Sequence, residues 1–334
     1  MGEQILHLYL KKYKKIFLSF FISIFILITL LGEIHSVSSE KINYIKDPSN
    51  IYKVSAGTNL NSVITDLQQD WYKRILLKFY IKIYSISVIK SGDYDIQDLT
   101  YKSFINNLQQ GNVIQRKFSI IEGMNKYDIL KLIDNLNIDN NCINLECLNK
   151  DLNFIEGTLY PDTYFYTSSD SLANILQLSQ AKMLNILEEL WEQKTPSNPL
   201  KTKYEALILA SIIEKEAGNN SEKNTIAGVF HNRLKQGMRL EADPTIIYGL
   251  LPNFDGDIKK KDILDSNNLY NTYRINGLPP TPIAIPSLSS LKSAILAPEN
   301  NYLFFVASGN GDHYFSVTYN EHLEAVKRYQ LKDK

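Results

Sequence analysis

The stretch LILASIIEKEAG, Leu207 to Gly218, decides how the second half of the chain folds. Its apolar residues occupy every side of the helix that it predicts, which is the pattern of a helix buried in a core. The last two turns nevertheless carry Glu214 and Glu216. A buried carboxylate is costly unless it is paired or performs chemistry. We therefore predict a central buried helix that begins near Thr202 and holds a functional acid at its end.

The two carboxylates of this helix are not expected to act on the same substrate atom. At about 100° of rotation per residue, Glu216 shares an apolar face with Leu209 and Ile212, and Glu214 points roughly 200° away from it. Apolar neighbours and the negative end of the helix dipole both raise the pKa of a carboxyl at this place. Glu216 is therefore the predicted general acid. Glu214 is expected to pair with Lys215 or with a residue across a cleft; alternatively, both carboxylates only cap the end of a surface helix.

The N-terminus predicts the compartment. Residues 16–31, IFLSFFISIFILITLL, are sixteen uncharged and mostly apolar residues, close to the roughly 17–25 that cross a bilayer as a helix. The KKYKK before them is a basic cluster, which the positive-inside rule keeps in the cytoplasm. We expect a cytoplasmic tail at 1–15, a transmembrane anchor at 16–32 and an exported body. A cleaved signal peptide is the alternative, with Ser36 and Ser38 as a poor cleavage pair.

Charge and cysteine content argue against several classes of site. The 334 residues hold 36 Lys and Arg against 36 Asp and Glu, so no basic surplus points to nucleic acid. The two cysteines, Cys142 and Cys147, have no histidine or second cysteine pair near them in the sequence, so we expect no metal site, and we expect no cofactor. In an oxidising compartment the two would form a small local disulfide; otherwise they are free thiols.

The exported part divides by composition into a linker and two folded regions. We expect an α+β protein with a linker at 33–50, a small α+β subdomain at 51–150 and a mixed α+β domain at 151–334. VSAGTNLNSVITDL, from Val54, is weakly repeated as IIEGMNKYDILKLI, from Ile120. Each copy predicts a strand, a Gly turn and a capped helix. The unit resembles the LysM carbohydrate-binding module, and the alternative is an ordinary strand-turn-helix repeat.

Other segments predict the elements around the buried helix. SVIKSGDYDI predicts a strand and a Gly-Asp turn, and FIEGTLYPDTYFYTSS predicts a loop built on Gly157 and Pro161. An amphipathic helix is expected from about Ser171 to Trp191. YNTYRINGLPPTPIAIPS is too rich in Pro and Gly for a regular element. The chain closes with a hairpin that turns at 309–312 and with a final helix.

Polar and aromatic residues gather in the loops that follow the buried helix, as they do in the walls of a cleft. EADPTIIYG supplies Glu241, Asp243, Thr245 and Tyr248, and YNTY supplies Asn271 and Tyr273. Each has a plainer interpretation as well, since Asp-Pro is common at a helix cap or turn and a tyrosine is common in a core.

Four segments, taken in order, resemble the endolytic murein transglycosylase family, also described as YceG-like: ASIIEKEAG, VFHNRLKQGMRLEADPTIIYG, YNTY with GLPPTPI, and YLFFVASGNGDHYFSVTYNEH. The resemblance covers essentially the whole chain. It implies that 151–334 is a catalytic domain, a lyase that cleaves the β-1,4 bond between N-acetylmuramic acid and N-acetylglucosamine in nascent peptidoglycan and leaves a 1,6-anhydro end. It also implies a bacterial inner membrane, with penicillin-binding proteins and the cell-wall elongation machinery as neighbours.

The resemblance also assigns residues. The catalytic glutamate of the family is the second Glu of its E-K-E motif, which is Glu216 here. The family's cleft positions correspond to Glu156, Asp162, Glu214, Asn232, Arg233, Asp243, Thr245, Asn271 and Tyr273. We add Glu241 and Tyr248 as substrate-binding candidates. The family commonly has Gln at 241 and Gly at 281 and 287, where this chain has Glu241, Thr281 and Ser287. A further carboxylate at 241 alters the expected pKa pattern, because like charges raise one another's pKa.

One acid suffices for the implied reaction, because the 6-hydroxyl of the muramic acid itself attacks the anomeric carbon. Glu216 would first protonate the leaving oxygen and then accept the proton of that hydroxyl. A hydrolytic muramidase is the enzymatic alternative; it needs a second carboxylate at about 5–5.5 Å or 6.5–9.5 Å, for which Glu241 and Asp243 are candidates. A non-catalytic wall anchor with a LysM module is the alternative from another class.

Overall fold

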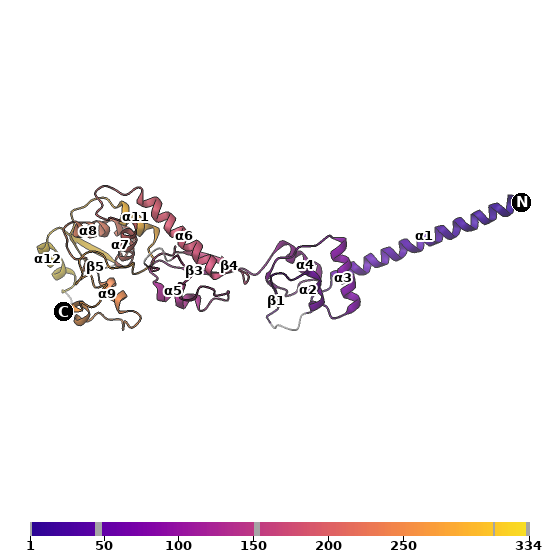
Figure 1. Ribbon diagram of the computed structural model, residues 1–334, viewed down its shortest axis with the longest axis horizontal. Coiled ribbons are helices and arrows are strands. Elements are labelled where there is room, and N and C mark those ends of the chain that lie inside the picture. Colours follow the sequence, from indigo (N-terminus) through magenta and orange to yellow (C-terminus); the bar gives the residue numbers. More distant parts are fainter. Residues whose placement is uncertain (1, 44–48, 150–153, 310, 332–334) are drawn as a thin grey trace. The chain divides into compact units, whose positions relative to one another are not determined.

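The computed structural model describes residues 2–43, 49–149, 154–309 and 311–331. It is a mixed α+β protein whose chain divides into two compact units (Figure 1). Unit 1 comprises Met1–Arg116 with Tyr166–Ser169, and unit 2 comprises Lys117–Phe165 with Asp170–Lys334. The boundary that the sequence predicts between residues 150 and 151 lies outside the described residues.

One long N-terminal helix, α1 (Gly2–Ser38), carries the apolar run. Its segment Lys12–Ser38 contains an exposed window with a mean hydropathy of 2.4, so it is long and apolar enough to cross a membrane. The sequence predicts a linker from residue 33, but the helix continues through Ser38. The reason is that Ile34 and Val37 are buried in the hydrophobic core of unit 1. The end of α1 is thus part of the folded unit.

A two-stranded sheet and three further helices form the rest of unit 1. These elements are β1 (Ile51–Val54), α2 (Leu60–Leu67), α3 (Trp71–Ile83), β2 (Gly92–Asp95) and α4 (Tyr101–Gln110). β1 and β2 are antiparallel, with Ile51 opposite Asp95 and Val54 opposite Gly92. The predicted Gly-Asp turn at 92–93 is wrong, because both residues lie within β2.

The two copies of the repeat have the predicted local structure. In the first, β1 leads through Gly57 into α2, and the Asn59 side chain caps α2 by accepting the Ser62 N–H. In the second, β3 (Arg116–Ile120) leads through Gly123 into α5 (Lys126–Ile133), which Asn125 caps. Both glycines have φ near +80°, where a side chain would be strained. The repeat is therefore one strand-turn-helix design used twice.

Unit 2 gathers helices α6, α8, α9 and α11 against α7 (Lys203–Glu216). The other elements of this part of the chain are a 3₁₀ turn at Ile143–Leu145, β4 (Asp162–Tyr166), α6 (Leu172–Trp191), α8 (Lys223–Lys235), α9 (Asp243–Leu250), α10 (Lys260–Leu264), α11 (Leu288–Leu296), β5 (Phe304–Gly309), β6 (Asp312–Ser316) and α12 (Tyr319–Tyr329). The predicted helix at 171–191 corresponds to α6, which begins after its cap Ser171.

Helix α7 begins where the sequence predicts. Thr202 caps it by accepting the backbone N–H of Glu205 at 3.1 Å. Every side chain from Ala206 to Ile213 is buried. The one hydroxyl in this run, Ser211, donates to the carbonyl of Ile208 at 2.7 Å, so it is satisfied inside the core. The last turn of α7 is thus attached to a well-packed segment.

Three loop predictions have different outcomes. Residues 154–169 do not form only a loop, because β4 lies within them and pairs with β3. The ring of Phe118 stacks on Tyr164 with centroids 5.7 Å apart, and this packing favours the strand. Residues 270–287, all of them described, contain no helix or strand, as predicted. The closing hairpin of β5 and β6 turns at the predicted place, with Gly309 opposite Asp312.

Cys142 and Cys147 form a disulfide. Of the two alternatives for these cysteines, the structure contains the disulfide. It closes a loop of four residues, 143–146, around the 3₁₀ turn at Ile143–Leu145. A disulfide is typical of proteins that fold in an oxidising compartment.

Candidate active site

Glu216 is the last residue of α7, and Ala217 after it leaves the helical conformation. Its side chain is partly accessible to solvent. Among the residues that the structure describes, none donates a hydrogen bond to its carboxylate. An unbonded carboxyl in crowded surroundings keeps a proton more readily than a hydrated one. This is the setting of a group that can give a proton to a ligand.

The pKa of Glu216 is raised to about 8, first by burial and then by the carboxylate of Asp243, against the opposing charge of Arg233. The direction agrees with the prediction from the sequence. The sequence argument named apolar neighbours and the helix end, and the nearby Asp243 is an additional cause. At neutral pH the Glu216 carboxyl therefore holds its proton, as a general acid must.

Five side chains interact around this carboxyl, and we call them the Glu216 cluster: Glu216, Arg233, Glu241, Asp243 and Tyr273. The hydroxyl of Tyr273 donates to Asp243 Oδ1 at 2.7 Å. Arg233 Nη1 lies 3.3 Å from Glu241 Oε2. Burial and the bond to Asp243 raise the pKa of Tyr273, so its hydroxyl stays protonated and donates. The cluster thus joins one neutral acid to charged and polar groups from α7, α8, α9 and the loops beside them.

Backbone geometry fixes the members of the cluster. Arg233, at the end of α8, is buried and donates to the carbonyls of Leu303 and Leu240 at 2.7 and 2.8 Å. Glu241 has φ of 51°, a left-handed conformation that is strained for a residue with a side chain. Asp243 begins α9, directly before the proline that opens the helix. Such strain is often found where a fold aims a side chain at a ligand.

Three predicted site residues are not members of the Glu216 cluster and have structural partners. Thr245 is fully buried, and its hydroxyl donates to the carbonyl of Ala242 at 2.6 Å. The Asn271 amide, also buried, donates to the backbone carbonyls of Asp262, Ile263 and Asp265. The Asn232 amide donates to the carbonyls of Asn300 and Tyr302 at 2.8 and 2.9 Å. These side chains hold the loops that carry the cluster.

Glu156 and Tyr248 form a separate buried pair. The hydroxyl of Tyr248 donates to Glu156 Oε2 at 2.8 Å, and the backbone N–H groups of Lys126 and Gly157 donate at 3.0 and 3.2 Å. Burial raises the pKa of Glu156, and these hydrogen bonds oppose the rise. The pair ties α9 to the loop before β4 and to the start of α5.

Asp162 and Lys182 form an exposed ion pair at 2.7 Å between β4 and α6. The carboxylate of Asp162 is therefore engaged by α6 rather than by the Glu216 cluster.

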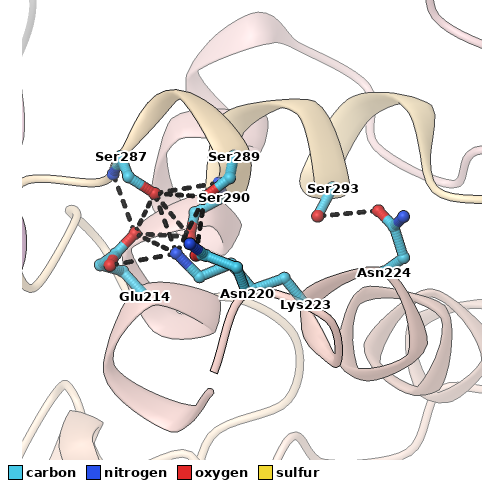
Figure 2. Close-up of polar contacts among 8 residues, drawn as sticks. All are labelled: Glu214, Asn220, Lys223, Asn224, Ser287, Ser289, Ser290 and Ser293. Atoms are coloured by element: carbon cyan, nitrogen blue, oxygen red, sulfur yellow. Dashed lines mark hydrogen bonds and ion pairs between the residues drawn. The ribbon is translucent and has the colours of Figure 1, made fainter. Parts of the chain in front are cut away.

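Glu214 belongs to a separate polar network. Figure 2 shows this network between Glu214, Lys223 and the serines at the start of α11. The Glu214 carboxylate accepts from the Ser287 N–H at 2.9 Å and from the hydroxyls of Ser287 and Ser290 at 2.5 and 2.6 Å. Lys223 Nζ, on α8, lies 3.0 Å from Glu214 Oε2. Burial alone would raise the pKa of Glu214, but these donors together lower it. Of the two carboxyls at the end of α7, Glu214 is thus the ionised one and Glu216 the protonated one.

The network rules out Lys215, one of the two expected kinds of partner for Glu214, and adds residues that the sequence argument missed. The partner of Glu214 is Lys223 rather than the neighbouring Lys215, whose Nζ lies 3.4 Å from the carbonyl of Gly123. Lys223 also donates to the hydroxyls of Ser287 and Ser289, both at 3.0 Å. The SLSS run at the start of α11 was the available signal, because it offers several hydroxyls at one helix end.

No group of three His, Cys, Asp or Glu side chains in the described part of the chain is arranged to hold a metal ion.

Comparisons with known proteins agree with this architecture. The YceG-like family model matches residues 52–328. The endolytic murein transglycosylase of Bacillus subtilis (strain 168) is 35% identical over 175 residues, which are 52% of this chain and 48% of that protein. The endolytic murein transglycosylase of Streptococcus pneumoniae serotype 2 (strain D39) is 24% identical over 311 residues, 80% of this chain and 56% of that protein. The chain thus spans about half the length of the curated relatives it matches.

A crystal structure of a yceG-like protein from Listeria monocytogenes has the same fold. It aligns with a TM-score of 0.50 and 28% sequence identity, over 82% of this chain and 98% of that one. The family match covers well over half of the residues, from before α2 to within α12. The chain belongs to the YceG-like family.

Proposed function

We propose that this chain is a membrane-anchored endolytic lytic transglycosylase of peptidoglycan. It would cleave the β-1,4 bond between N-acetylmuramic acid and N-acetylglucosamine in nascent strands and leave 1,6-anhydro ends. The relatives named endolytic murein transglycosylase support this class of reaction. The observation that carries the proposal is the carboxyl of Glu216, with a pKa of about 8 and no hydrogen-bond donor among the described residues.

In the proposed mechanism, Glu216 acts twice. It first gives its proton to the bridging oxygen as the bond from the anomeric carbon to that oxygen breaks. The 6-hydroxyl oxygen of the muramic acid then bonds to the anomeric carbon, and its proton passes to the Glu216 carboxylate. Atoms and charges balance without a water molecule, and the acid returns to its starting state. A pKa near neutrality suits both steps.

The other members of the Glu216 cluster would prepare this acid and contact the glycan. Asp243 favours the protonated form of Glu216 by charge repulsion, and its carboxylate is held in place by the hydroxyl of Tyr273, which donates to it. Its negative charge also stabilises the positive charge that develops at the sugar ring. Tyr273 and Glu241 are the proposed sugar contacts. Asn232, Thr245, Asn271, Glu156 and Tyr248 support the loops that carry the cluster, as their hydrogen bonds indicate.

Hydrolysis is the second candidate, because the cluster contains more than one carboxylate. Asp243 lies near enough to Glu216 to raise the pKa of its carboxyl. Glu241 forms an ion pair with Arg233, whose charge also acts on Glu216. Either carboxylate is a candidate to activate a water molecule, as inverting glycosidases do. The outcome differs in the product, since hydrolysis leaves a reducing end and transglycosylation leaves an anhydro end.

The anchor and the partners are part of the proposal. The apolar helix α1 would cross the bacterial inner membrane, with the KKYKK cluster cytoplasmic and both units on the other side. The LysM-like region at 51–150 would bind glycan, and Asn59, Asn61 and Ser62 of its first repeat copy line a shallow hollow at α2. Enzymes that polymerise the strands, such as penicillin-binding proteins, would then be neighbours.

The test is product analysis. Purified glycan strands are digested with the full chain in detergent, with Glu216→Gln and with Glu205→Gln, a matched change on the first turn of the same helix. Mass spectrometry then identifies the new ends. Anhydro ends from wild type and Glu205→Gln but not from Glu216→Gln are expected. Reducing ends would indicate a hydrolytic muramidase. Strands that stay intact with every protein would support the non-catalytic wall anchor instead.

A further inference from the structure

Helix α3 of unit 1 exposes an apolar stripe. Trp71, Ile75, Phe79 and Ile83 recur every fourth residue and are 66%, 42%, 46% and 51% exposed. At about 100° per residue they cover roughly 120° of the helix surface. The opposite side of α3 holds Leu76, Leu77 and Tyr80 in the core. The helix therefore has two apolar faces, and one of them is free at the surface of unit 1.

Basic residues border the exposed stripe. The helix contains Lys73, Arg74, Lys78 and Lys82 and no acidic residue. Lys78 and Lys82 are exposed: at about 100° per residue Lys78 lies roughly 20° outside the arc of the stripe and Lys82 roughly 20° inside its edge, whereas Lys73 binds Glu40 at 2.6 Å. An exposed helix with aromatic and branched apolar residues on one side and cations beside them is typical of a segment that lies on an anionic membrane.

Helix α3 packs next to α1, so its exposed stripe lies close to the membrane that α1 is proposed to cross. Ile34 and Val37, just after the apolar run of α1, pack in the same core as Leu76 and Leu77 of α3. From Leu31 to Val37 the helix rises by about 9 Å, six residues of 1.5 Å each. The headgroup layer of one leaflet is about 5–7 Å thick. Figure 1 shows α3 at the end of unit 1 from which α1 leaves.

We propose that α3 lies in the interface of the membrane that α1 crosses, with the Trp71, Ile75, Phe79 and Ile83 stripe among the acyl chains and Lys78 and Lys82 on anionic headgroups. Unit 1 would then have a fixed orientation on the bilayer instead of hanging from a flexible tether. The proposal rests on the proposed membrane anchor but does not require catalysis. A second copy of the chain is the competing occupant of the stripe.

The test uses tryptophan fluorescence of the full chain in vesicles of phosphatidylethanolamine and phosphatidylglycerol with brominated acyl chains. Trp191→Phe leaves Trp71 as the reporter on α3. A control carries Trp71→Phe, Trp191→Phe and Lys53→Trp, which moves the reporter to an exposed position on β1, at the far end of unit 1 from α1 (Figure 1). Ile75→Glu with Phe79→Glu, in the Trp191→Phe background, disrupts the stripe at two exposed positions and is not expected to disturb the fold.

Trp71 is expected to lie roughly 5–10 Å into the interface and to lose about half of its emission or more. The control reporter should keep nearly all of its emission, and the Ile75→Glu, Phe79→Glu protein should recover most of that of Trp71. Protein that floats with the vesicles while Trp71 stays unquenched would overturn the proposal and leave the anchor intact. If Trp71 emission is blue-shifted but not quenched and the protein is a dimer, the stripe is instead buried against a second copy of the chain. Protein that does not float with the vesicles at all would overturn the anchor and this proposal together, and product analysis would still test the chemistry.

Discussion

Replacing Lys223 by Met tests the network that holds the end of α7. The change removes the cation beside Glu214 and keeps a side chain of similar length in the same space. The two side chains are only 5% and 12% exposed, so water cannot replace the lost partner. The Glu214 carboxylate would remain ionised next to an apolar group, two residues before the proposed acid.

The expected loss follows from this burial. Removing one partner of a buried ion pair costs about 3–5 kcal/mol. Glu214 keeps three donors from Ser287 and Ser290 after the change, so we expect the low end, about 3 kcal/mol in the free energy of unfolding of unit 2. Lys223→Met with Glu214→Gln leaves no buried charge, and the Gln carbonyl still accepts from the serines. The double variant should lose only about 1 kcal/mol.

The assay is urea unfolding of the full chain in detergent with Trp71→Phe, which leaves Trp191 on α6 to report on unit 2. Lys215→Met, on α7 next to Glu214, is the matched control, and it should change stability by less than about 0.5 kcal/mol because Lys215 is exposed. The lowered pKa of Glu214 adds a pH signature. Its stabilisation is present above the ordinary pKa of a glutamate and is lost as the pH falls through the lowered value. A loss below about 1 kcal/mol for Lys223→Met, or equal losses for the single and double variants, would refute the reasoning.

Three further predictions concern the site and its supports. Asp243→Asn removes a charge that raises the pKa of Glu216. We expect kcat/KM of wild type to fall above about pH 8, and this fall should move to lower pH in the variant; an unchanged profile would contradict the pairing. Tyr248→Phe removes a donor to the buried Glu156 and should lower the free energy of unfolding of unit 2 by about 1.5–3 kcal/mol in urea unfolding. An unchanged stability would contradict this hydrogen bond. Gly218→Ala places a Cβ 2.2 Å from a carbonyl oxygen of the β5–β6 turn, so the end of α7 must shift and kcat/KM should fall by about 10–100-fold in strand cleavage; activity near that of wild type would contradict the close approach.

Local sequence patterns predicted the parts of this fold that depend on neighbours in the chain. Asn59 and Asn125 predicted the capped helices of the repeat, and Thr202 marked the start of α7, because a cap bonds to residues two or three positions away. The E-K-E spacing separated Glu214 from Glu216 by helix geometry alone. These features need no knowledge of tertiary contacts.

The missed features depend on distant contacts. Lys223 meets Ser287, which is 64 residues away, and nothing in the sequence around Lys223 distinguishes it from a surface lysine. Thr245 and Asn271 look like polar cleft residues, yet both are buried: the hydroxyl of Thr245 also bonds to that of Thr272, 27 residues away, and the Asn271 amide donates to backbone carbonyls at the end of α10. The extension of α1 through Ser38 depends on packing of Ile34 and Val37 in a core that the polar composition of 33–50 conceals.

The pKa of Glu216 tests the central claim most directly. The chain is labelled with ¹³C at glutamate side-chain carboxyls, and the signal that disappears in Glu216→Gln is followed from about pH 3 to 10, a range that extends about 1.5–2 units beyond the ordinary and the raised values. We predict a midpoint at about 8, so that the carboxyl keeps its proton at neutral pH and can give it to the leaving sugar oxygen. A midpoint at the ordinary glutamate value of 4.5 would show an ionised, hydrated side chain and contradict the account.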